Sequence, residues 1–495
     1  MDPAPLRNPP TAESFLTGRR LFCPALGAIH VVAALSLVFQ VCGLLGKNGI
    51  QPASNFLSAA RAELGLAAFL KIPTLCWISD SDGMLLTLCA LQAGAGALML
   101  AGKLPGAAAL TAWAAFLSLC SVGSPFLDFQ WDGLLLETSL LAAFFLPWNA
   151  TPRWNEESDI QRIARWLLGW LLFRLLLLSG VVKLASGDPE WRNLTALCHH
   201  FETQPLPLWT AFYLHKLHPL LLKAGVVAMF AMELIVPFGF FSRQWRTRAV
   251  LATALLQAAL ILSGNFAYFN WLTLALCAPL LPDTSWRRIP PSFLPHPSRK
   301  TPSPPIRLAG FSALALLALL VTGLQTLSAF LPGSHPQTLA RSASGLLAPL
   351  RSFNSYGLFA RMTTQRPEIV LEGSSDGVVW RGYKFKWKVE DPWKRPELVA
   401  PFHPRLDWQM WFAALGSIRD SPWLVHFIQR LLQGSPDVLS LLAENPFPEK
   451  PPVWIRARLF EYQFATSGSA WWVREERGLF CPPVRLSPEA ATEGR

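Results

Sequence analysis

The sequence is poor in charged residues, and this scarcity limits the class of protein. Asp, Glu, Lys and Arg make up 15% of the 495 residues, against roughly 25% in soluble domains. Apolar residues account for 52%, and the mean hydropathy is +0.31. These values exclude an ordinary soluble globular protein. The formal net charge of +11 does not indicate a nucleic-acid partner, because much of the excess lies in loops that flank apolar runs.

Cysteine pairs and catalytic motifs are also scarce. The eight cysteines are scattered, mostly within apolar runs, and no CxxC spacing occurs. Neither a disulfide framework nor a zinc site is therefore expected. The sequence has no HExxH motif, no Walker A loop and no GxGxxG motif after a strand, and we expect no nucleophile elbow. We predict no cofactor, no metal and no hydrolase chemistry.

Long apolar runs are the main feature that is present. A hydrocarbon core about 30 Å thick needs roughly 20 helical residues, and a polytopic α-helical membrane bundle is predicted over residues 1–331. Its spans, about nine and uncertain by about two, lie at 24–46, 85–102, 106–123, 133–147, 163–182, 219–241, 248–264, 266–282 and 307–331. We expect the first run to be retained rather than cleaved as a signal peptide. Residues 62–79 indicate an interfacial or re-entrant piece, because Lys71 and Pro73 interrupt them.

Basic residues in the loops between these spans indicate the orientation. Fifteen Lys and Arg residues fall on the side of the N-terminus and six on the opposite side. The positive-inside rule therefore places the N-terminus in the cytoplasm and the chain after about residue 332 in the lumen or periplasm. Residues 284–306, rich in Ser and Pro, predict a cytoplasmic linker, and residues 183–218 predict an extracytoplasmic loop.

The composition changes beyond residue 350. We predict a C-terminal extracytoplasmic α+β domain with an antiparallel sheet over residues 350–485. Residues 381–389 alternate strictly and predict a strand whose lysines, Lys384, Lys386 and Lys388, face water. The expected hairpin covers 368–380, further strands are expected at 455–464 and 470–475, and helices at 406–416 and 422–443.

Four charged residues lie in or beside the apolar runs: Asp132, Glu137, Arg174 and Glu233. A charge in the bilayer centre costs about 2.5–3.5 kcal/mol on insertion scales. A pair such as Glu137 with Arg174 would relieve this cost. The favoured interpretation is a structural ion pair that locks the bundle, and the alternative is a ligand-binding or proton-handling site.

The densest polar stretch follows the fifth span. Its candidate residues are Lys183, Asp188, Trp191, Arg192, His199, His200, Glu202 and Gln204. We favour a folded extracytoplasmic cap, in which Trp191 anchors at the interface and Arg192 pairs with Asp188 or Glu202. The histidines that could bind a metal are His199, His200, His215 and His218. A metal site is disfavoured because adjacent histidines rarely point the same way and no carboxylate has a ligand spacing.

Seven stretches resemble the lipase maturation factor family, and the resemblance runs from about residue 20 to residue 485. In the membrane part they are Phe129-Gln-Trp-Asp-Gly-Leu-Leu-Leu-Glu137, Gly187-Asp-Pro-Glu-Trp-Arg-Asn-Leu-Thr195, His200-Phe-Glu-Thr-Gln-Pro-Leu-Pro207 and Leu262-Ser-Gly-Asn-Phe-Ala-Tyr-Phe-Asn-Trp-Leu-Thr273. In the tail they are Asn354-Ser-Tyr-Gly-Leu-Phe359, Arg405-Leu-Asp-Trp-Gln-Met-Trp-Phe-Ala-Ala414 and Leu441-Leu-Ala-Glu-Asn-Pro-Phe447.

This resemblance implies a multi-pass protein of the endoplasmic reticulum membrane that helps dimeric secreted lipases to fold. It implies a chaperone of the secretory pathway rather than an enzyme, whose partners are the lipid bilayer and a secreted client, and whose C-terminal domain contacts that client. The client-contact candidates in the tail are Arg405, Asp407, Trp408 and Trp411. The aromatic residues would make a sticky surface if exposed, although such residues are more often core.

Two departures from the animal members bear on the compartment. The tail has one cysteine, Cys481, which argues against disulfide-linked handling of a client. Arginine outnumbers lysine and no retention signal is visible, which fits a bacterial relative in the cytoplasmic membrane. The sequon that starts at Asn193 fits a eukaryote instead. Both compartments therefore remain open from the sequence.

A fainter similarity supports an alternative function. Gly180-Val-Val-Lys183-Leu, followed by Asp188 and Trp191, is similar to a motif in the membrane domain of the vitamin K-dependent carboxylase. There the corresponding lysine is the catalytic base. The alternative is thus a polytopic membrane enzyme with Lys183 as base. A lysine that snorkels to the membrane surface is the structural interpretation of the same residue.

Overall fold

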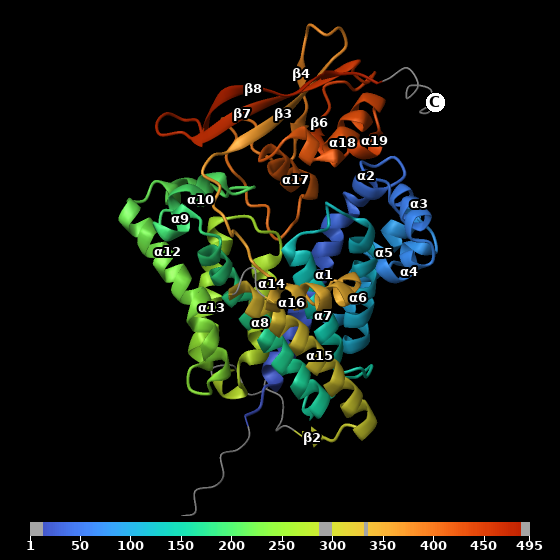
Figure 1. The fold of residues 1–495 in the computed structure, drawn as a ribbon, viewed down its shortest axis with the longest axis vertical. Helices are drawn as coiled ribbons and strands as arrows, with labels where there is room; N and C mark the ends of the chain where they lie inside the picture. The colour runs from blue at the N-terminus through green and yellow to red at the C-terminus, as the bar shows by residue number, and fades with distance from the viewer. Residues whose placement is uncertain (1–12, 287–298, 331–334, 487–495) are drawn as a thin grey trace, which may run out of the picture.

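A bundle of long helices forms one part of the chain, and an α+β domain covers one of its ends (Figure 1). The computed structural model describes residues 13–286, 299–330 and 335–486. The bundle helices are α1 (Leu16–Val38), α5 (Asp82–Leu100), α6 (Pro105–Val122), α7 (Gln130–Phe145), α8 (Asp159–Ala185), α12 (Pro219–Leu234), α13 (Arg246–Ser263), α14 (Phe269–Cys277) and α15 (Pro305–Phe330).

Each of the nine predicted spans corresponds to one of these helices, so the polytopic membrane bundle is confirmed. Within the described residues, seven helices are long and apolar enough to cross a membrane; one of them is α12 together with η2 (Val236–Phe241). The other two are shorter. α7 has 16 residues, and α14 continues into η3 (Ala278–Leu280) and ends there. The short turn that contains Asn265 connects α13 to α14.

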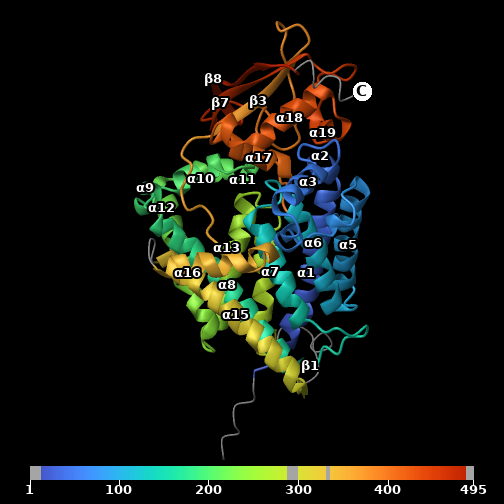
Figure 2. The same ribbon diagram turned by 45° about the vertical axis from the view of Figure 1, so that its right-hand side comes forward.

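Short helices connect the spans at the end that carries the C-terminal domain. They are α2 (Val41–Leu45), α3 (Ala53–Leu64), α4 (Ala67–Lys71), η1 (Leu75–Trp77), α9 (Pro189–Arg192), α10 (Leu197–Thr203) and α11 (Trp209–His215). The predicted re-entrant piece at 62–79 thus consists of short helical turns. α9 to α11 lie directly beneath the C-terminal domain (Figures 1 and 2).

The opposite end of the bundle carries a small parallel pair of strands. β1 (Glu156–Ser158) pairs with β2 (Arg299–Thr301) beside α15, and η4 (Asp283–Trp286) follows α14. The predicted linker at 284–306 lies partly outside the described residues. Arg19 of α1 donates to the carbonyls of Trp154 and Glu156 at this end, which fixes the loop before β1 against the start of the bundle.

The predicted antiparallel sheet of the C-terminal domain is confirmed. Its order is β4-β3-β7-β8, with the strands β3 (Pro367–Ser374), β4 (Arg381–Gly382), β7 (Trp454–Phe464) and β8 (Trp472–Val484). Leu459 pairs with Ile369 on one side and with Gly478 on the other. Helices α17 (Arg405–Ala414), α18 (Pro422–Gln433) and α19 (Pro436–Leu439) lie between the sheet and the bundle (Figure 1).

The predicted strand at 381–389 is wrong in its length and in its lysine face. It comprises only β4 and β5 (Lys384–Phe385), and β5 pairs with β6 (Leu442–Glu444) in a separate small sheet. The apolar side of the pattern is buried as expected, but Lys388 is buried too. Its ammonium lies 3.1 Å from Glu368 of the neighbouring strand. Alternation of residue types could not reveal this buried partner.

The chain between the two parts does not leave the bundle at once. After α15, helix α16 (His335–Leu347) crosses α15 and α8 on the outside of the bundle (Figure 2). The following η6 (Ala348–Leu350) leads into residues 351–359, which lie against α7 and α8. The first residues of the predicted tail are therefore packed inside the membrane part.

Candidate functional site

Asp132, at the start of α7, binds the C-terminal domain through Arg405. The two terminal nitrogens of Arg405 each lie 2.9 Å from one oxygen of Asp132. Arg405 also donates to the carbonyl of Phe126, and the Tyr268 hydroxyl donates to Asp132. Both charged side chains are fully buried. Two-point contact of this kind fixes orientation as well as distance, so α17 is held rigidly on α7.

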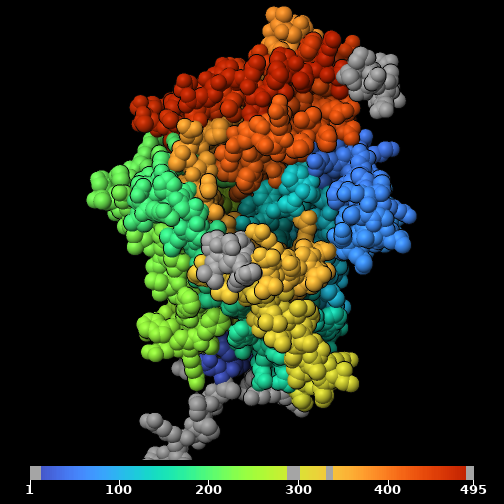
Figure 3. Space-filling view, viewed as in Figure 1, coloured from blue at the N-terminus to red at the C-terminus, as the bar shows by residue number. Residues whose placement is uncertain are grey.

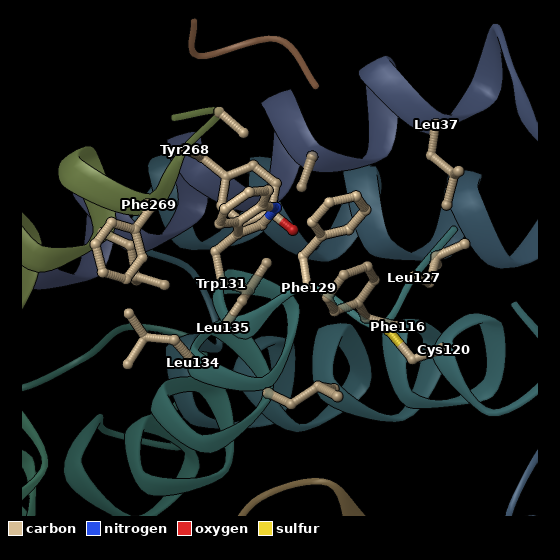
Figure 4. Packing of buried hydrophobic residues seen from close by; sticks show 14 of the residues in the cluster. Leu37, Phe116, Cys120, Leu127, Phe129, Trp131, Leu134, Leu135, Tyr268 and Phe269 are labelled. Atoms are coloured by element: carbon tan, nitrogen blue, oxygen red, sulfur yellow. The ribbon is translucent and has the colours of Figure 1, made fainter. Parts of the chain in front are cut away.

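Aromatic residues surround this ion pair. Trp408 of α17 packs against Trp131 and Phe129 of the α7 start, with ring centroids 4.9 and 5.7 Å apart. Figure 4 shows Phe129, Trp131 and Tyr268 in one continuous cluster with apolar side chains of the bundle. The membrane part and the tail therefore share one hydrophobic core.

Glu137 and Arg174 contact each other inside the bundle, as expected. Glu137 also accepts hydrogen bonds from the Tyr356 hydroxyl at 2.7 Å and the Asn354 backbone at 3.2 Å. Arg174 donates to the Asn354 carbonyl at 2.8 Å. The pair thus has a third partner that lies in the tail. Asn354 and Tyr356 belong to the stretch that resembles the lipase maturation factors.

Lys183 and Glu233 form a third buried ion pair, between α8 and α12. The Lys183 ammonium lies 2.7 and 2.8 Å from the two oxygens of Glu233. Lys183 also lies over the Trp191 ring, 5.3 Å from its centroid. The helices approach closely here because residue 180 is glycine; a Cβ at Gly180 would lie 2.6 Å from Leu234. The interpretation of Lys183 as a snorkelling residue is therefore wrong, since its charge is neutralised inside the protein.

A cavity of about 320 Å³ lies beside this third pair. Its walls come from α8, α10, α12, α13 and α14, with Phe359 of the tail closing one side. Most of the lining is apolar. Lys183, Trp191 and His200, which were predicted from the loop sequence, contribute polar groups, as do Glu233 of α12, Gln257 of α13 and Asn270 of α14. The arrangement can hold a small amphipathic molecule.

The loop after α8 is folded as predicted, but with different contacts. Asp188 caps α9 through the Glu190 backbone and accepts a hydrogen bond from the Met362 backbone at 2.6 Å. Arg192 is exposed, and among the described residues it makes no ion pair, so its predicted pairing is wrong. Trp191 is buried and donates to the Phe359 carbonyl. It therefore binds the tail rather than the membrane surface.

The next residues of this loop also contact the tail. Glu202 accepts a hydrogen bond from the Phe464 backbone of β7. The Gln204 carbonyl accepts one from Arg366 of the tail, while its side chain donates to the Ser263 carbonyl of α13. His199 is partly exposed beside Glu190, whereas His200 is buried between Phe359 and Phe266. The two adjacent imidazoles therefore face different surroundings.

Two residues that the sequence did not single out complete the contact between loop and tail. Arg366, buried before β3, donates to the carbonyls of Glu202, Gln204 and Pro205. Asn265 accepts hydrogen bonds from the backbones of residues 399 and 400 and donates to the carbonyls of residues 206 and 397. The position of Asn265, a polar residue between two apolar runs, could have indicated that its side chain has hydrogen-bond partners. No sequence signal pointed to Arg366.

The structure does not support the four client-contact candidates of the tail. Arg405, Asp407, Trp408 and Trp411 are all buried. They lie on the faces of α17 that meet the bundle and the rest of the C-terminal domain, where a client cannot reach them. Asp407 accepts hydrogen bonds from the backbones of Trp387 and Lys388. Of the neighbouring aromatic residues, Phe412 is exposed.

Residues 373–377 have the letters of a nucleophile motif but not its structure. Gly373-Ser-Ser-Asp-Gly377 has the letters of a Gly-x-Ser-x-Gly motif. The segment forms the turn between β3 and β4, in which Asp376 accepts hydrogen bonds from the backbones of Val378 and Val379. A nucleophile elbow requires a strand followed by a helix, so this turn is not one.

Glu390 gives the C-terminal domain a pH-dependent stability. Burial raises the pKa of its carboxyl from 4.5 to about 7, and the charge of Lys388 offsets part of this effect. In the unfolded chain the carboxyl ionises near its usual pKa, so the folded state loses stability as the pH rises from about 4.5 through about 7.

We expect Glu390→Gln to remove this loss. The variant should be more stable than the unchanged protein at pH 8, by about 1–3 kcal/mol, and equally stable near pH 4. Thermal unfolding of the detergent-purified chain across this pH range measures the difference. Glu475→Gln, at an exposed position of β8, is the control and should show no pH-dependent difference.

Comparisons with known proteins agree with this two-part structure. The family model described as the lipase maturation factor transmembrane domain matches residues 17–288, and the one described as the lipase maturation factor C-terminal domain matches residues 352–482. No solved structure matches the chain.

Similar proteins cover nearly the whole chain. Lipase maturation factor 2 of Homo sapiens is 34% identical over 584 residues, covering 94% of this chain and 82% of the relative. Lipase maturation factor 1 of Mus musculus is 32% identical, covering 96% and 88%. Lipase maturation factor 1 of Homo sapiens is also 32% identical, covering 98% and 92%. The chain, a multi-pass integral membrane protein, therefore belongs to the lipase maturation factor family.

Proposed function

We propose that this protein is a membrane-bound maturation factor that helps secreted proteins to fold, with lipases as the clients that its relatives' names indicate. The match of both family models in one chain carries this proposal. The buried contacts through Asp132, Glu137 and Arg366 support it, because they hold the C-terminal domain at one end of the bundle. A domain held in this way can act on a client close to the membrane.

The proposed orientation places the C-terminal domain outside the cytoplasm. The helix ends and loops at the opposite end carry Arg20, Lys103, Arg153, Arg162 and Arg243, and a positive side faces the cytoplasm. The domain would then lie in the lumen of the endoplasmic reticulum in a eukaryote, or in the periplasm of a bacterium. Secreted clients fold in both compartments.

A polar groove is the proposed contact for the client. About 790 Å³ in volume, it lies between the α2–α3 segment and α18, where the blue and orange segments of Figure 3 meet. Asn48, Asn55, Gln429 and Gln433 line it. Amide side chains both donate and accept hydrogen bonds, as a peptide backbone does. The groove therefore suits an extended segment of an unfolded client, whatever its sequence.

Lipase secretion by cells that lack their own maturation factor tests this function. The full chain should restore secreted lipase activity, and a chain that ends after residue 351 should not. The triple variant Asn55→Ala, Gln429→Ala and Gln433→Ala should reduce activity at least fivefold, because several hydrogen bonds of about 1 kcal/mol each are lost. Glu475→Ala with Arg477→Ala on exposed β8 is the matched control. Undiminished secretion with the shortened chain, at equal protein level, would refute the proposal.

The second candidate function is a membrane enzyme that uses Lys183 as base. The position of Lys183 in the wall of a cavity favours it. Against it stands the contact of the ammonium with both oxygens of Glu233, because this lysine would have to give up a proton before it could act as a base.

Removing both charges separates the two functions. Lys183→Met alone should reduce the amount of folded protein, because it leaves Glu233 buried without a partner at a cost of about 3–5 kcal/mol. Lys183→Met with Glu233→Met should restore it, since replacing a whole buried pair by apolar residues is often neutral. We expect the double variant to mature lipase within about threefold of the unchanged protein. A well-folded but inactive double variant would indicate that Lys183 is the base.

A further inference from the structure

The cavity beside Lys183 contains two buried amides that have no partner. Gln257 of α13 and Asn270 of α14 are 2% and 3% exposed. Their side-chain oxygens make no hydrogen bond with any residue of the described chain. Both residues line the cavity. A buried polar group without a partner costs about 1–3 kcal/mol, so two unpartnered amide oxygens in a mostly apolar cavity indicate a ligand that satisfies them.

The lining carries no net charge. The charge of Lys183 is matched by Glu233, and burial, reinforced by the charge of Lys183, lowers the pKa of His200 to about 4. His200 is therefore neutral at physiological pH. A ligand with a phosphate, carboxylate or ammonium head would bring an unmatched charge into this lining, which is costly in an apolar surrounding. The chemistry fits a neutral head that bears hydroxyl and carbonyl groups.

The cavity opens sideways between two spans. On α12 its lining residues Gly225 and Met229 are partly exposed, and on α13 Ala259 is exposed. Both helices lie at the outer side of the bundle (Figure 1). In a membrane this opening faces acyl chains, so a lipid can enter without crossing water and leave the end of its chain in the bilayer.

We propose that the cavity binds a neutral glycerolipid with a free hydroxyl group, of the monoacylglycerol or diacylglycerol class. The hydroxyl donates to the oxygen of Gln257 or Asn270, the ester carbonyl accepts from an amide nitrogen, and the acyl chain occupies the apolar walls. The proposal of a lipid ligand is independent of the proposed maturation function, and the binding experiment that tests it uses no lipase.

Binding of radiolabelled monooleoylglycerol to the full-length protein in phosphatidylcholine nanodiscs tests the proposal. We expect saturable binding. Unlabelled monooleoylglycerol should compete at least tenfold better than oleate or lysophosphatidylcholine, which carry the same chain with a charged head.

Three variants assign the binding to this cavity. Gln257→Leu with Asn270→Leu should weaken binding about tenfold, because two hydrogen bonds are lost. Ala259→Trp, at the exposed opening, should block entry and remains informative if the double variant does not fold. The control is Gln92→Leu, an equally buried amide on α5 outside the cavity, which should bind normally.

Absence of saturable binding would overturn the proposal, and so would equal competition by all three amphiphiles. Unchanged binding by a folded double variant together with unchanged binding by Ala259→Trp would also overturn it. If only water filled the cavity, no saturable binding would be observed.

Discussion

Arg405→Leu should release the C-terminal domain from the bundle and remove most of the correctly folded protein. The substitution leaves the carboxylate of Asp132 buried between Tyr268 and apolar residues without its cation. Breaking a buried ion pair in this way costs about 3–5 kcal/mol, a large share of the stability of a typical domain. Limited trypsin digestion in detergent, followed by size-exclusion chromatography, measures the folded fraction and the release of the domain.

Two controls separate this pair from the general effect of losing an arginine. Arg153→Leu removes an exposed ion pair with Glu156, and such pairs contribute about 0–1 kcal/mol, so its digestion pattern should not change. Asp132→Leu combined with Arg405→Leu should be less harmful than either change alone, because no charge is left unmatched. If Arg405→Leu resisted trypsin as the unchanged protein does, this ion pair would not hold the two parts together.

Glu137→Ala should destabilise the protein by a similar amount, but inside the bundle, where residues 351–359 lie against α7 and α8. It leaves Arg174 without its carboxylate inside the bundle and removes the acceptor of Tyr356 and of the Asn354 backbone. We expect a loss of about 3–5 kcal/mol and the release of residues 351–359 from α7 and α8. Hydrogen exchange with mass spectrometry would show faster exchange in this segment, while β7 and β8 keep their protection.

The matched control is Glu444→Ala, which removes the exposed partner of Lys384. Hydrogen exchange in residues 351–359 should not change in this control variant. Glu137→Gln is the finer variant, because it keeps the shape and one acceptor oxygen but not the charge. Slow exchange of residues 351–359 in both Glu137 variants would contradict the role given to this carboxylate.

The helical bundle could be predicted from the sequence alone, because whether a segment spans the bilayer depends mainly on its own residues. Twenty apolar residues span the hydrocarbon wherever they occur in a chain, so each predicted run became a helix. The pairing of Glu137 with Arg174 was foreseeable for the same reason: a charge inside a membrane needs a partner. The sheet was predicted from the hairpin turn after β3 and from the further strands expected at 455–464 and 470–475, whereas the alternation at 381–389 gave only the short strands β4 and β5.

The contacts between the two parts could not be foreseen. The partner of Asp132 lies 273 positions later in the chain, and no local pattern relates two residues so far apart. Tyr356 lies in a stretch that resembles the family and Arg366 does not, but nothing in the sequence indicates that they contact Glu137 and the α10 loop. The alternation of residue types along 381–389 predicted that Lys388 faces water. Its burial depends on the ion pair with Glu368, which lies on a different strand, and alternation within one strand cannot show such a partner. Most polar residues of the candidate site thus turned out to join the tail to the bundle, and the cavity became visible only once α8, α12 and α13 had been placed together.

The side of the membrane that the C-terminal domain occupies tests the proposed function most directly. In a variant whose eight native cysteines are replaced by alanine, single cysteines at Val378, in the exposed β3–β4 turn, and at Gln244, in the loop before α13, mark the two ends of the molecule. Sealed vesicles with the cytoplasmic face outward are treated with a membrane-impermeant maleimide. The proposed orientation predicts that Gln244→Cys reacts at once and that Val378→Cys reacts only after detergent is added. Immediate reaction of Val378→Cys, with protection of Gln244→Cys, would place the domain in the cytoplasm and contradict a role in the maturation of secreted proteins.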